Sequence, residues 1–416
     1  MTGALRRNPF RDGLTPTLMP GRTVDIVAVG PPPFDPYHPA ASAWALAAAL
    51  AAAGDDVQVL HLPGSEAALA PPGVTAVPVN IPLRRPGGPH EPAEFASAAG
   101  RKLRKGVELV LRDPAGLGAL GVSRARRGPI VVGFTRGVEL HSFEGERPGR
   151  PGAGFVDRLD TWLDRRSVRR LERAALQEAD RLVYDAAEVA RSISEEYAVP
   201  DRKMVPLPPA VPELPPLPSR ELSRQNLRIP QDVPVAVAPM AFDVREPSGL
   251  DRVLDAFRRV RPFFPGVRLV VCGAPAPSDP GVISLPDRHA ETLADALAGA
   301  DVAVFARRSP GFDPGMVLAA RAGVPPIVLP DARFPLDPKG GVRIAATTDA
   351  GDLASILAEL LADPASQKEV GRSAQRFAEA FLPSRVASAL GVAIAPPSTV
   401  AGVSARARTA RRGATP

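Results

Sequence analysis

A proline-rich stretch at residues 206–218 constrains the fold of this chain more than any other feature. It holds seven prolines in 13 residues and shows neither helical nor strand periodicity. Proline lacks a backbone N–H and fixes φ, so it interrupts helix interiors and central strands. A chain of 416 residues is also too long for one ordinary hydrophobic core. We therefore predict two domains joined by a rigid linker at these prolines.

The half before the prolines shows the pattern of a parallel sheet with crossover helices. An apolar strand at 24–29 leads through a loop at Gly30 into a helix at 40–53, and a second strand follows at 57–62. This start is typical of doubly wound α/β folds. Further elements are predicted in this half: strands at 74–79, 107–111, 130–135 and 181–184, and helices at 156–177 and 186–197.

The same pattern restarts after the prolines. A strand at 233–237 is followed by a helix at 249–260 and a strand at 267–272. The remaining predicted elements are strands at 282–285, 302–306, 326–329 and 342–345, and helices at 291–297, 316–322, 352–361, 365–380 and 383–392. The chain therefore reads as two α/β halves, each with its own parallel sheet.

Composition excludes several classes of protein. Aromatic residues make up 5% of the chain, which argues against base-stacking platforms and hence against nucleic acid as a partner. The single cysteine, Cys272, excludes an internal disulfide and a cysteine metal cluster, and its apolar surroundings predict a buried side chain. The five histidines have no metal-ligand spacing, so we expect no metal site.

The first 22 residues lack the apolar core of a signal peptide, and the longest apolar run, at 40–53, is too short to span a bilayer. We therefore expect a cytoplasmic protein, with peripheral contact at the inner face of the membrane as an alternative. Five arginines lie between Arg165 and Arg173. A solvated helix is the simpler interpretation of this region, and a surface that rests on anionic lipid is the other.

One literal G-x-G-x-x-G motif spans Gly116 to Gly121. In a dinucleotide site these glycines follow the first strand directly and open a helix. Here four residues, 112–115, separate the motif from its strand, and that strand is not the first of its half. Close helix packing explains the glycines better than a dinucleotide does, and an oxidoreductase stays only as a third hypothesis.

Cationic side chains follow several predicted strands. Arg245 lies in the loop after the first strand of the second half, and Arg307 and Arg308 directly follow strand 302–306. Because open α/β sheets bind ligands at the carboxyl ends of their strands, these arginines are candidates to hold phosphate. His141 follows strand 130–135 in the same way and is either an exposed loop residue or part of a site.

The order and the residue sequences of these segments resemble those of the GT-B glycosyltransferases of retaining family 4 over about residues 22–394. The segments that carry the resemblance are "VDIVAVGPPP", "RGPIVVGFTRGVE", "LADALAGADVAVFARRSPGF" and "AGVPPIVLPD". The resemblance implies two Rossmann-like doubly wound domains that face each other across a cleft. The implied domains are a 1–21 extension, a 22–205 acceptor-side domain, a 206–219 linker, a 220–382 nucleotide-sugar domain, a 383–394 helix that crosses back, and a disordered basic tail at 395–416.

The resemblance also implies an activity, which is the transfer of a sugar from a nucleotide-sugar without a metal. The acceptor would be a glycan, a lipid or a small molecule, and no further cofactor is implied. Candidate catalytic residues are Arg136, His141 and Asp313. Candidate donor-binding residues are Gly30, Arg245, Ser248, Gly273, Arg307, Arg308, Gly311 and Phe312.

The chain departs from the family pattern at the residues that usually grip the donor. The family has an arginine and a lysine after the first strand of the second domain, where this chain has Met240 or Ala241 and Ser248. The family's paired glutamates correspond to Pro310 and Leu318. Two hypotheses therefore stay open: a divergent glycosyltransferase, and a catalytically inactive GT-B protein that serves as a partner or scaffold in glycan or cell-envelope biosynthesis.

Overall fold

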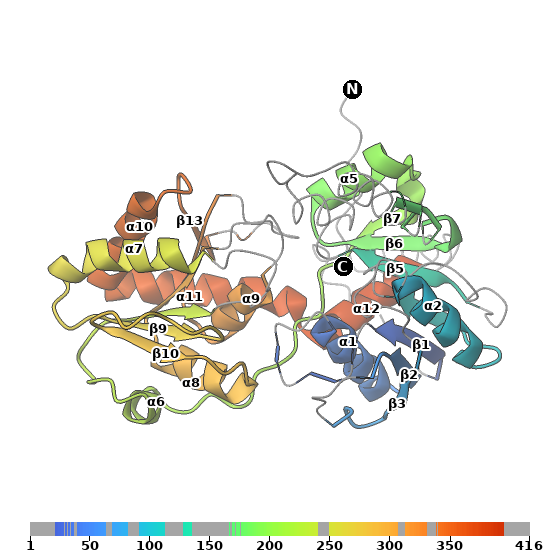
Figure 1. Cartoon of the computed structure of the whole chain (residues 1–416), viewed down its shortest axis with the longest axis horizontal. Helices are drawn as coiled ribbons and strands as arrows, with labels where there is room; N and C mark the ends of the chain where they lie inside the picture. The colour runs from blue at the N-terminus through green and yellow to red at the C-terminus, as the bar shows by residue number, and fades with distance from the viewer. Residues whose placement is uncertain are drawn as a thin grey trace, which may run out of the picture.

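The computed structural model shows two parallel sheets, each flanked by helices and lying side by side (Figure 1). It describes residues 21–394 except 29, 31, 34, 37–39, 64–68, 82–90, 113–127, 135–165, 167–168, 171, 175, 240–248, 307–312, 331–337 and 339. The fold is α/β, with two Rossmann-like domains, as the sequence pattern predicts.

The first sheet has seven parallel strands in the order β3-β2-β1-β4-β5-β6-β7. Helices α1 and α12 pack against one face, and α2 and α5 against the other. Its strands are β1 (Thr23–Ala28), β2 (Asp56–His61), β3 (Val74–Pro78), β4 (Leu109–Arg112), β5 (Ile130–Phe134), β6 (Arg181–Tyr184) and β7 (Met204–Pro206). Its helices are α1 (Ala41–Ala52), α2 (Glu91–Lys102), α5 (Ala187–Tyr197) and α12 (Pro383–Ile394).

The second sheet has six parallel strands in the order β10-β9-β8-β11-β12-β13. Helices α7 and α10 cover one face, and α8, α9 and α11 the other. The strands are β8 (Val235–Pro239), β9 (Arg268–Cys272), β10 (Val282–Leu285), β11 (Val302–Phe305), β12 (Pro326–Val328) and β13 (Arg343–Ile344). The helices are α6 (Arg220–Asn226), α7 (Leu250–Val260), α8 (Ala290–Gly299), α9 (Pro314–Arg321), α10 (Ala350–Ala362) and α11 (Pro364–Ala378).

Each sheet is sandwiched between two apolar layers, which explains the near-continuous apolar runs of its strands. In β8, Val235 and Val237 enter the core beside α8 and α9, whereas Ala236 and Ala238 enter the core beside α7. Successive side chains point to opposite faces of a strand, so both sets are buried at once.

The chain passes between the two domains twice, and each passage is short. Ala210 belongs to a core of the first domain, and Val211, its neighbour in sequence, belongs to a core of the second. On the return, Phe381 packs in the second domain and Val386 in the first. Helix α12 then lies against α1. We call residues 207–212 and 381–383 the two crossings.

Some elements were not predicted from the sequence, and some predictions concern residues that the structure does not describe. Helices α2 and α6 and strand β7 were not anticipated, and Pro206 is the last residue of β7. The motif at 116–121, residues 156–165 of the predicted helix and the tail at 395–416 lie outside the described residues. Within the described part of the chain, no single helix is long and apolar enough to cross a membrane, although the bent pair 364–381 and 383–394 passes by length and composition.

Candidate functional site

The carboxyl ends of the parallel strands mark where a ligand can bind in each domain. Of the residues that the sequence proposes for the site, Gly30, Gly273 and Asp313 are described by the structure. The others, Arg136, His141, Arg245, Ser248, Arg307, Arg308, Gly311 and Phe312, lie outside the described residues and stay predictions.

Gly30 is buried at the end of the first strand, where the chain turns toward α1. Its carbonyl oxygen accepts a 3.0 Å hydrogen bond from Nε1 of Trp44. The indole ring meets His61 edge-on, with the ring centroids 5.6 Å apart. This contact joins the ends of β1 and β2 to α1 and sets the position of the first loop of the first domain.

Gly273 follows β9 with φ at +82°, a conformation that other residues adopt only with strain. Its N–H donates a 2.8 Å hydrogen bond to the carbonyl of Leu285, which ends β10. The glycine therefore has a structural role in the turn. Because glycine has no side chain, the backbone at this point of the carboxyl edge of the second sheet is not covered by one.

Asp313 is the N-cap of α9. Its Oδ1 accepts a 2.9 Å hydrogen bond from the N–H of Gly315, and Pro314 opens the helix. Aspartate at this position satisfies a backbone donor that the helix leaves unpaired. The carboxylate that the sequence proposes as a sugar-binding group therefore already caps the first turn of α9.

Leu318 has no exposed surface and packs in the core between α9 and the second sheet. Its neighbours Val317 and Ala319 are equally buried. The position that the sequence analysis matched to a family glutamate therefore holds an aliphatic side chain inside the core. The other such position, Pro310, lies outside the described residues.

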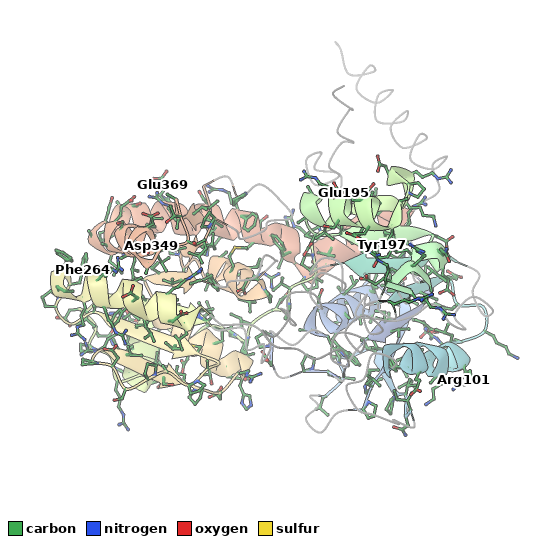
Figure 2. All side chains as sticks on the ribbon, turned by 45° about the horizontal axis from the view of Figure 1, so that its top comes forward. Arg101, Glu195, Tyr197, Phe264, Asp349 and Glu369 are labelled. Atoms are coloured by element: carbon green, nitrogen blue, oxygen red, sulfur yellow. The ribbon has the colours of Figure 1, made fainter. Side chains whose placement is uncertain are left out.

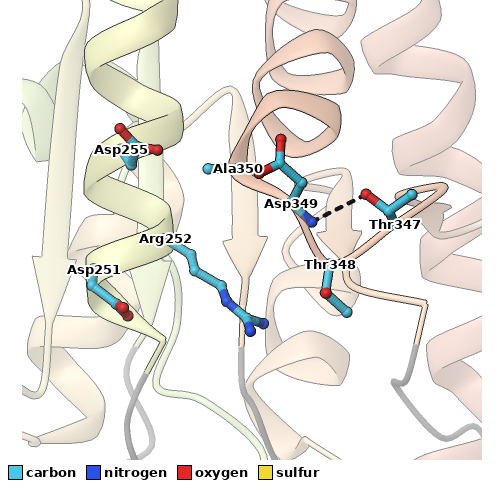
Figure 3. Close-up of a pocket in the computed structure, with 7 residues that line it drawn as sticks. All are labelled: Asp251, Arg252, Asp255, Thr347, Thr348, Asp349 and Ala350. Carbon is cyan, nitrogen blue, oxygen red and sulfur yellow. Dashed lines mark hydrogen bonds between the residues drawn. The ribbon is translucent and has the colours of Figure 1, made fainter.

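A polar pocket of about 510 Å³ opens between the N-terminal ends of α7 and α10 (Figure 3). Helix α7 follows the loop after β8, and α10 follows β13, so the pocket lies at the carboxyl edge of the second sheet. Its lining residues are Asp251, Arg252, Asp255, Thr347, Thr348, Asp349 and Ala350.

The acidic groups of this pocket are engaged by other partners. Arg259 lies 3.0 Å from a carboxylate oxygen of Asp255 and 3.9 Å from one of Asp349. Asp349 also caps α10 by accepting from the N–H of Gly351 at 2.7 Å. Arg252 is half-buried, and its guanidinium has no hydrogen bond or ion pair within the part of the chain that the structure describes.

The lining of the pocket includes groups that are suited to bind an anion. These are a guanidinium with no partner among the described residues, two threonines and the N-terminal ends of two helices. Sequence reasoning did not identify Arg252, Thr347 or Thr348. A signal was present, because Thr347 and Thr348 follow a strand and immediately precede the N-cap Asp349.

An ion pair also joins the two domains. Arg288, just before α8, lies 3.7 Å from Asp35 in the first loop of the first domain. An apolar pocket of about 520 Å³ lies beside this pair, along α1, and reaches the crossings at Pro212 and Pro383. The loops at the carboxyl edges of the two domains therefore approach each other.

The basic region from Arg165 to Arg173 is partly described. Arg166, Arg170 and Arg173 are exposed, and Arg169 forms a 2.9 Å ion pair with Glu196. Glu172 is buried and accepts a hydrogen bond from the hydroxyl of Tyr197. Burial of the Tyr197 ring raises the pKa of its hydroxyl well above the usual range, and the carboxylate of Glu172 adds to this effect. Membrane contact at this surface stays a prediction.

The family model for Glycosyltransferase Family 4 matches residues 40–213. A sucrose-phosphate synthase from Thermosynechococcus elongatus superposes with a TM-score of 0.66 at 17% identity, over 89% of this chain and 97% of that one. This chain has the GT-B fold, and its residues 40–213 are similar to Glycosyltransferase Family 4.

Two further structures support the GT-B assignment of the fold. WaaG, a glycosyltransferase involved in lipopolysaccharide biosynthesis, has a TM-score of 0.66 at 17% identity, over 88% of this GT-B chain and 98% of its own. HepE from Anabaena, in complex with UDP-glucose, has a TM-score of 0.62 at 11% identity, over 88% and 97%. No curated protein matches the chain in sequence.

Proposed function

We propose that this GT-B protein transfers a sugar from a nucleotide-sugar to a glycan, lipid or small-molecule acceptor. The observation that carries the proposal is Arg252, whose guanidinium has no partner among the described residues and lines the polar pocket at the carboxyl edge of the second sheet. A nucleotide-sugar presents a pyrophosphate, and a guanidinium with neighbouring hydroxyls is suited to bind it. HepE in complex with UDP-glucose and a starch synthase bound to ADP show that similar folds bind such nucleotides.

In this proposal the chain's own cations take the place of a metal ion. Arg252 binds a phosphate oxygen, and the hydroxyls of Thr347 and Thr348 donate to the same group. In the sequence, Arg245 comes shortly before α7, and Arg307 and Arg308 come shortly before α9. As the bond from sugar to phosphate breaks, charge develops on the departing nucleoside diphosphate, and fixed positive groups stabilise that charge.

The first domain supplies the acceptor side in this proposal. Arg136 and His141 follow β5 in the sequence, and β5 ends at the carboxyl edge of the first sheet. A histidine there is suited to accept the proton of an acceptor hydroxyl. Asp313, the N-cap of α9 in the second domain, is the local candidate to contact the sugar.

One observation favours the alternative, an inactive GT-B protein that acts as a partner or scaffold. Helix α9, Pro314–Arg321, contains no acidic residue, and Leu318 is fully buried. The single carboxylate at the start of α9 is the capping Asp313. A donor site without an acidic grip would bind the sugar weakly, because each charge-assisted hydrogen bond is worth roughly 1.5–3 kcal/mol.

Calorimetry against a panel of nucleotide-sugars and free nucleotides distinguishes the two functions. For the enzyme we expect one nucleotide class to bind with micromolar affinity and Arg252→Ala to weaken it at least about tenfold, a change of about 1.4 kcal/mol. Arg245→Ala and Arg307→Ala should weaken the same ligand. Arg372→Ala is the matched control, since Arg372 is exposed on α11.

Two results would count against the enzyme. The first is an absence of binding across the whole panel, which leaves the scaffold function. The second is binding that all of these variants retain, which would place the nucleotide elsewhere in the molecule. If a donor does bind and the arginine variants weaken it, release of free nucleotide on addition of an acceptor extract would establish transfer.

A further inference from the structure

The two crossings are tied to each other where they leave the second domain. The N–H of Val211 donates a 3.0 Å hydrogen bond to the carbonyl of Phe381. Val211 belongs to the first crossing and Phe381 to the second, and both side chains are buried in the same core of the second domain. One residue earlier, Ala210 packs in the first domain. The change from one core to the other is therefore confined to a single peptide unit.

One side chain holds both crossings at this point. Arg321, the last residue of α9, donates from one terminal nitrogen to the carbonyls of Val211 and Pro212, at 3.0 and 2.9 Å. Its other terminal nitrogen donates to the carbonyl of Phe381 at 2.8 Å. The planar fork of a guanidinium allows one residue to reach acceptors in two separate segments.

The environment of Arg321 is unusual for a cation. Burial lowers its pKa to about 10, and the negative charge of Glu213 opposes this shift. The Nε atom is buried and has no hydrogen-bond partner in the described part of the chain. At neutral pH the group is still charged, so a half-buried cation is held by three backbone carbonyls. Its partial removal from water costs free energy, which these hydrogen bonds offset.

We propose that Arg321 is the latch of the interdomain hinge. It fixes both crossings to the second domain, so that rotation between the domains is confined to residues on the first-domain side, 207–210 and 382–383. Helix α9 connects this latch to the carboxyl edge of the second sheet, because it begins at that edge and ends at Arg321. This inference concerns domain motion, and it holds whatever ligand the protein binds.

Distance measurement between two spin labels tests the latch. Glu195 lies exposed on α5 in the first domain, and Glu369 lies exposed on α11 in the second (Figure 2). The full chain with Glu195→Cys and Glu369→Cys can be labelled at these sites, since the native Cys272 is buried. We expect a narrow distance distribution in the parent protein. Arg321→Met should broaden and shift it, because neither crossing is then held.

Arg224 provides a matched control. Its side chain is fully buried, whereas that of Arg321 is half-buried, and its guanidinium binds the carbonyls of Gly299, Gln231 and Val233, which all lie in the second domain. Arg224→Met should lower stability and leave the interdomain distances unchanged in the folded fraction. The distribution of distances between the two labels should broaden in Arg321→Met and stay narrow in Arg224→Met.

A second variant keeps the proposal testable if Arg321→Met does not fold. Arg321→Lys retains the charge and much of the buried stem, but a single ammonium cannot reproduce the two-segment fork. We expect it to broaden the distances as well. A distribution equal to that of the parent in both Arg321 variants overturns the proposal, and so does equal broadening in Arg224→Met.

Discussion

Leu318 allows a structural role in α9 to be told apart from a role in ligand binding. The side chain is fully buried and packs with the aliphatic residues of the second core. We expect Leu318→Ala to lower the free energy of unfolding by about 2–5 kcal/mol, through lost burial and the cavity left behind. Urea denaturation followed by circular dichroism measures this loss.

Leu217→Ala is the control for this substitution, because Leu217 is 41% exposed. It should change stability by less than about 1 kcal/mol. A neutral Leu318→Ala combined with a change in ligand affinity would instead place Leu318 at the surface of the cleft.

Cys272 gives a second prediction at the level of a single residue. The thiol is buried at the end of β9, and burial raises its pKa, an effect to which the charge of Asp287 adds. A raised pKa means that the reactive thiolate is scarce at pH 7 to 9. A thiol reagent should therefore modify the native protein slowly and the urea-unfolded protein quickly, as absorbance assays can follow.

Glu195→Cys supplies an exposed thiol for comparison, and it should react in the native state at once. Rapid modification of Cys272 in the folded wild-type protein would show that β9 opens readily at its carboxyl end. That result would contradict the buried position described above.

At the level of elements, α9 allows the two roles of Asp313 to be separated. Asp313→Ala removes the N-cap and should destabilise the protein by about 0.5–2 kcal/mol. Asp313→Ser keeps a capping oxygen and should restore most of that loss. Thermal unfolding of the two variants measures the capping role.

Ligand affinity of the same variants measures the other role. If Asp313 also contacts a sugar, Asp313→Ser should remain stable yet bind the donor more weakly, since a serine hydroxyl is a shorter and neutral group. Equal affinity in the serine variant and the parent protein would assign Asp313 to capping only.

Most strands could be predicted because parallel strands buried on both faces are short apolar runs. Strand β8 and its neighbours in the second sheet were placed to within about two residues for this reason. Helix α6 was missed because it is only seven residues long, although Ser219 supplies an N-cap signal before it. Strand β7 was missed because a three-residue strand that ends in Pro206 looks like the linker that follows.

The candidate site was less predictable, for a physical reason. Arg252 and Thr348 are far apart in the sequence and meet because α7 and α10 pack side by side. Arg321 acts on carbonyl groups, and a backbone acceptor leaves no trace in the identity of its residue. Local patterns therefore place elements, whereas contacts between distant elements require the tertiary fold.

At the scale of the whole molecule, separate cores predict separate unfolding events. The cores around the first sheet and around the second share few residues, and they are joined by the crossings. We expect two transitions in calorimetry, because multidomain chains depart from two-state behaviour. Phe257→Ala should lower one transition and Ile193→Ala the other, each by roughly 5 to 20 °C.

Both substitutions remove fully buried side chains, one from each domain, so each serves as the control for the other. A single transition that both variants lower equally would show that the crossings couple the domains into one cooperative unit. The latch at Arg321 would then be stronger than three hydrogen bonds suggest.

The packing of α12 against α1 has a consequence for synthesis of the chain. Val386 and Leu390 complete a core whose other members, such as Trp44 and Leu50, lie near the start of the sequence. About 170 residues separate the last part of the first domain before the crossing from α12. A ribosome that adds about 5–20 residues per second needs about ten to thirty seconds to make them. Throughout that interval the nascent first domain presents an uncovered alanine-rich surface, and a newly made chain covers it only after α12 has emerged.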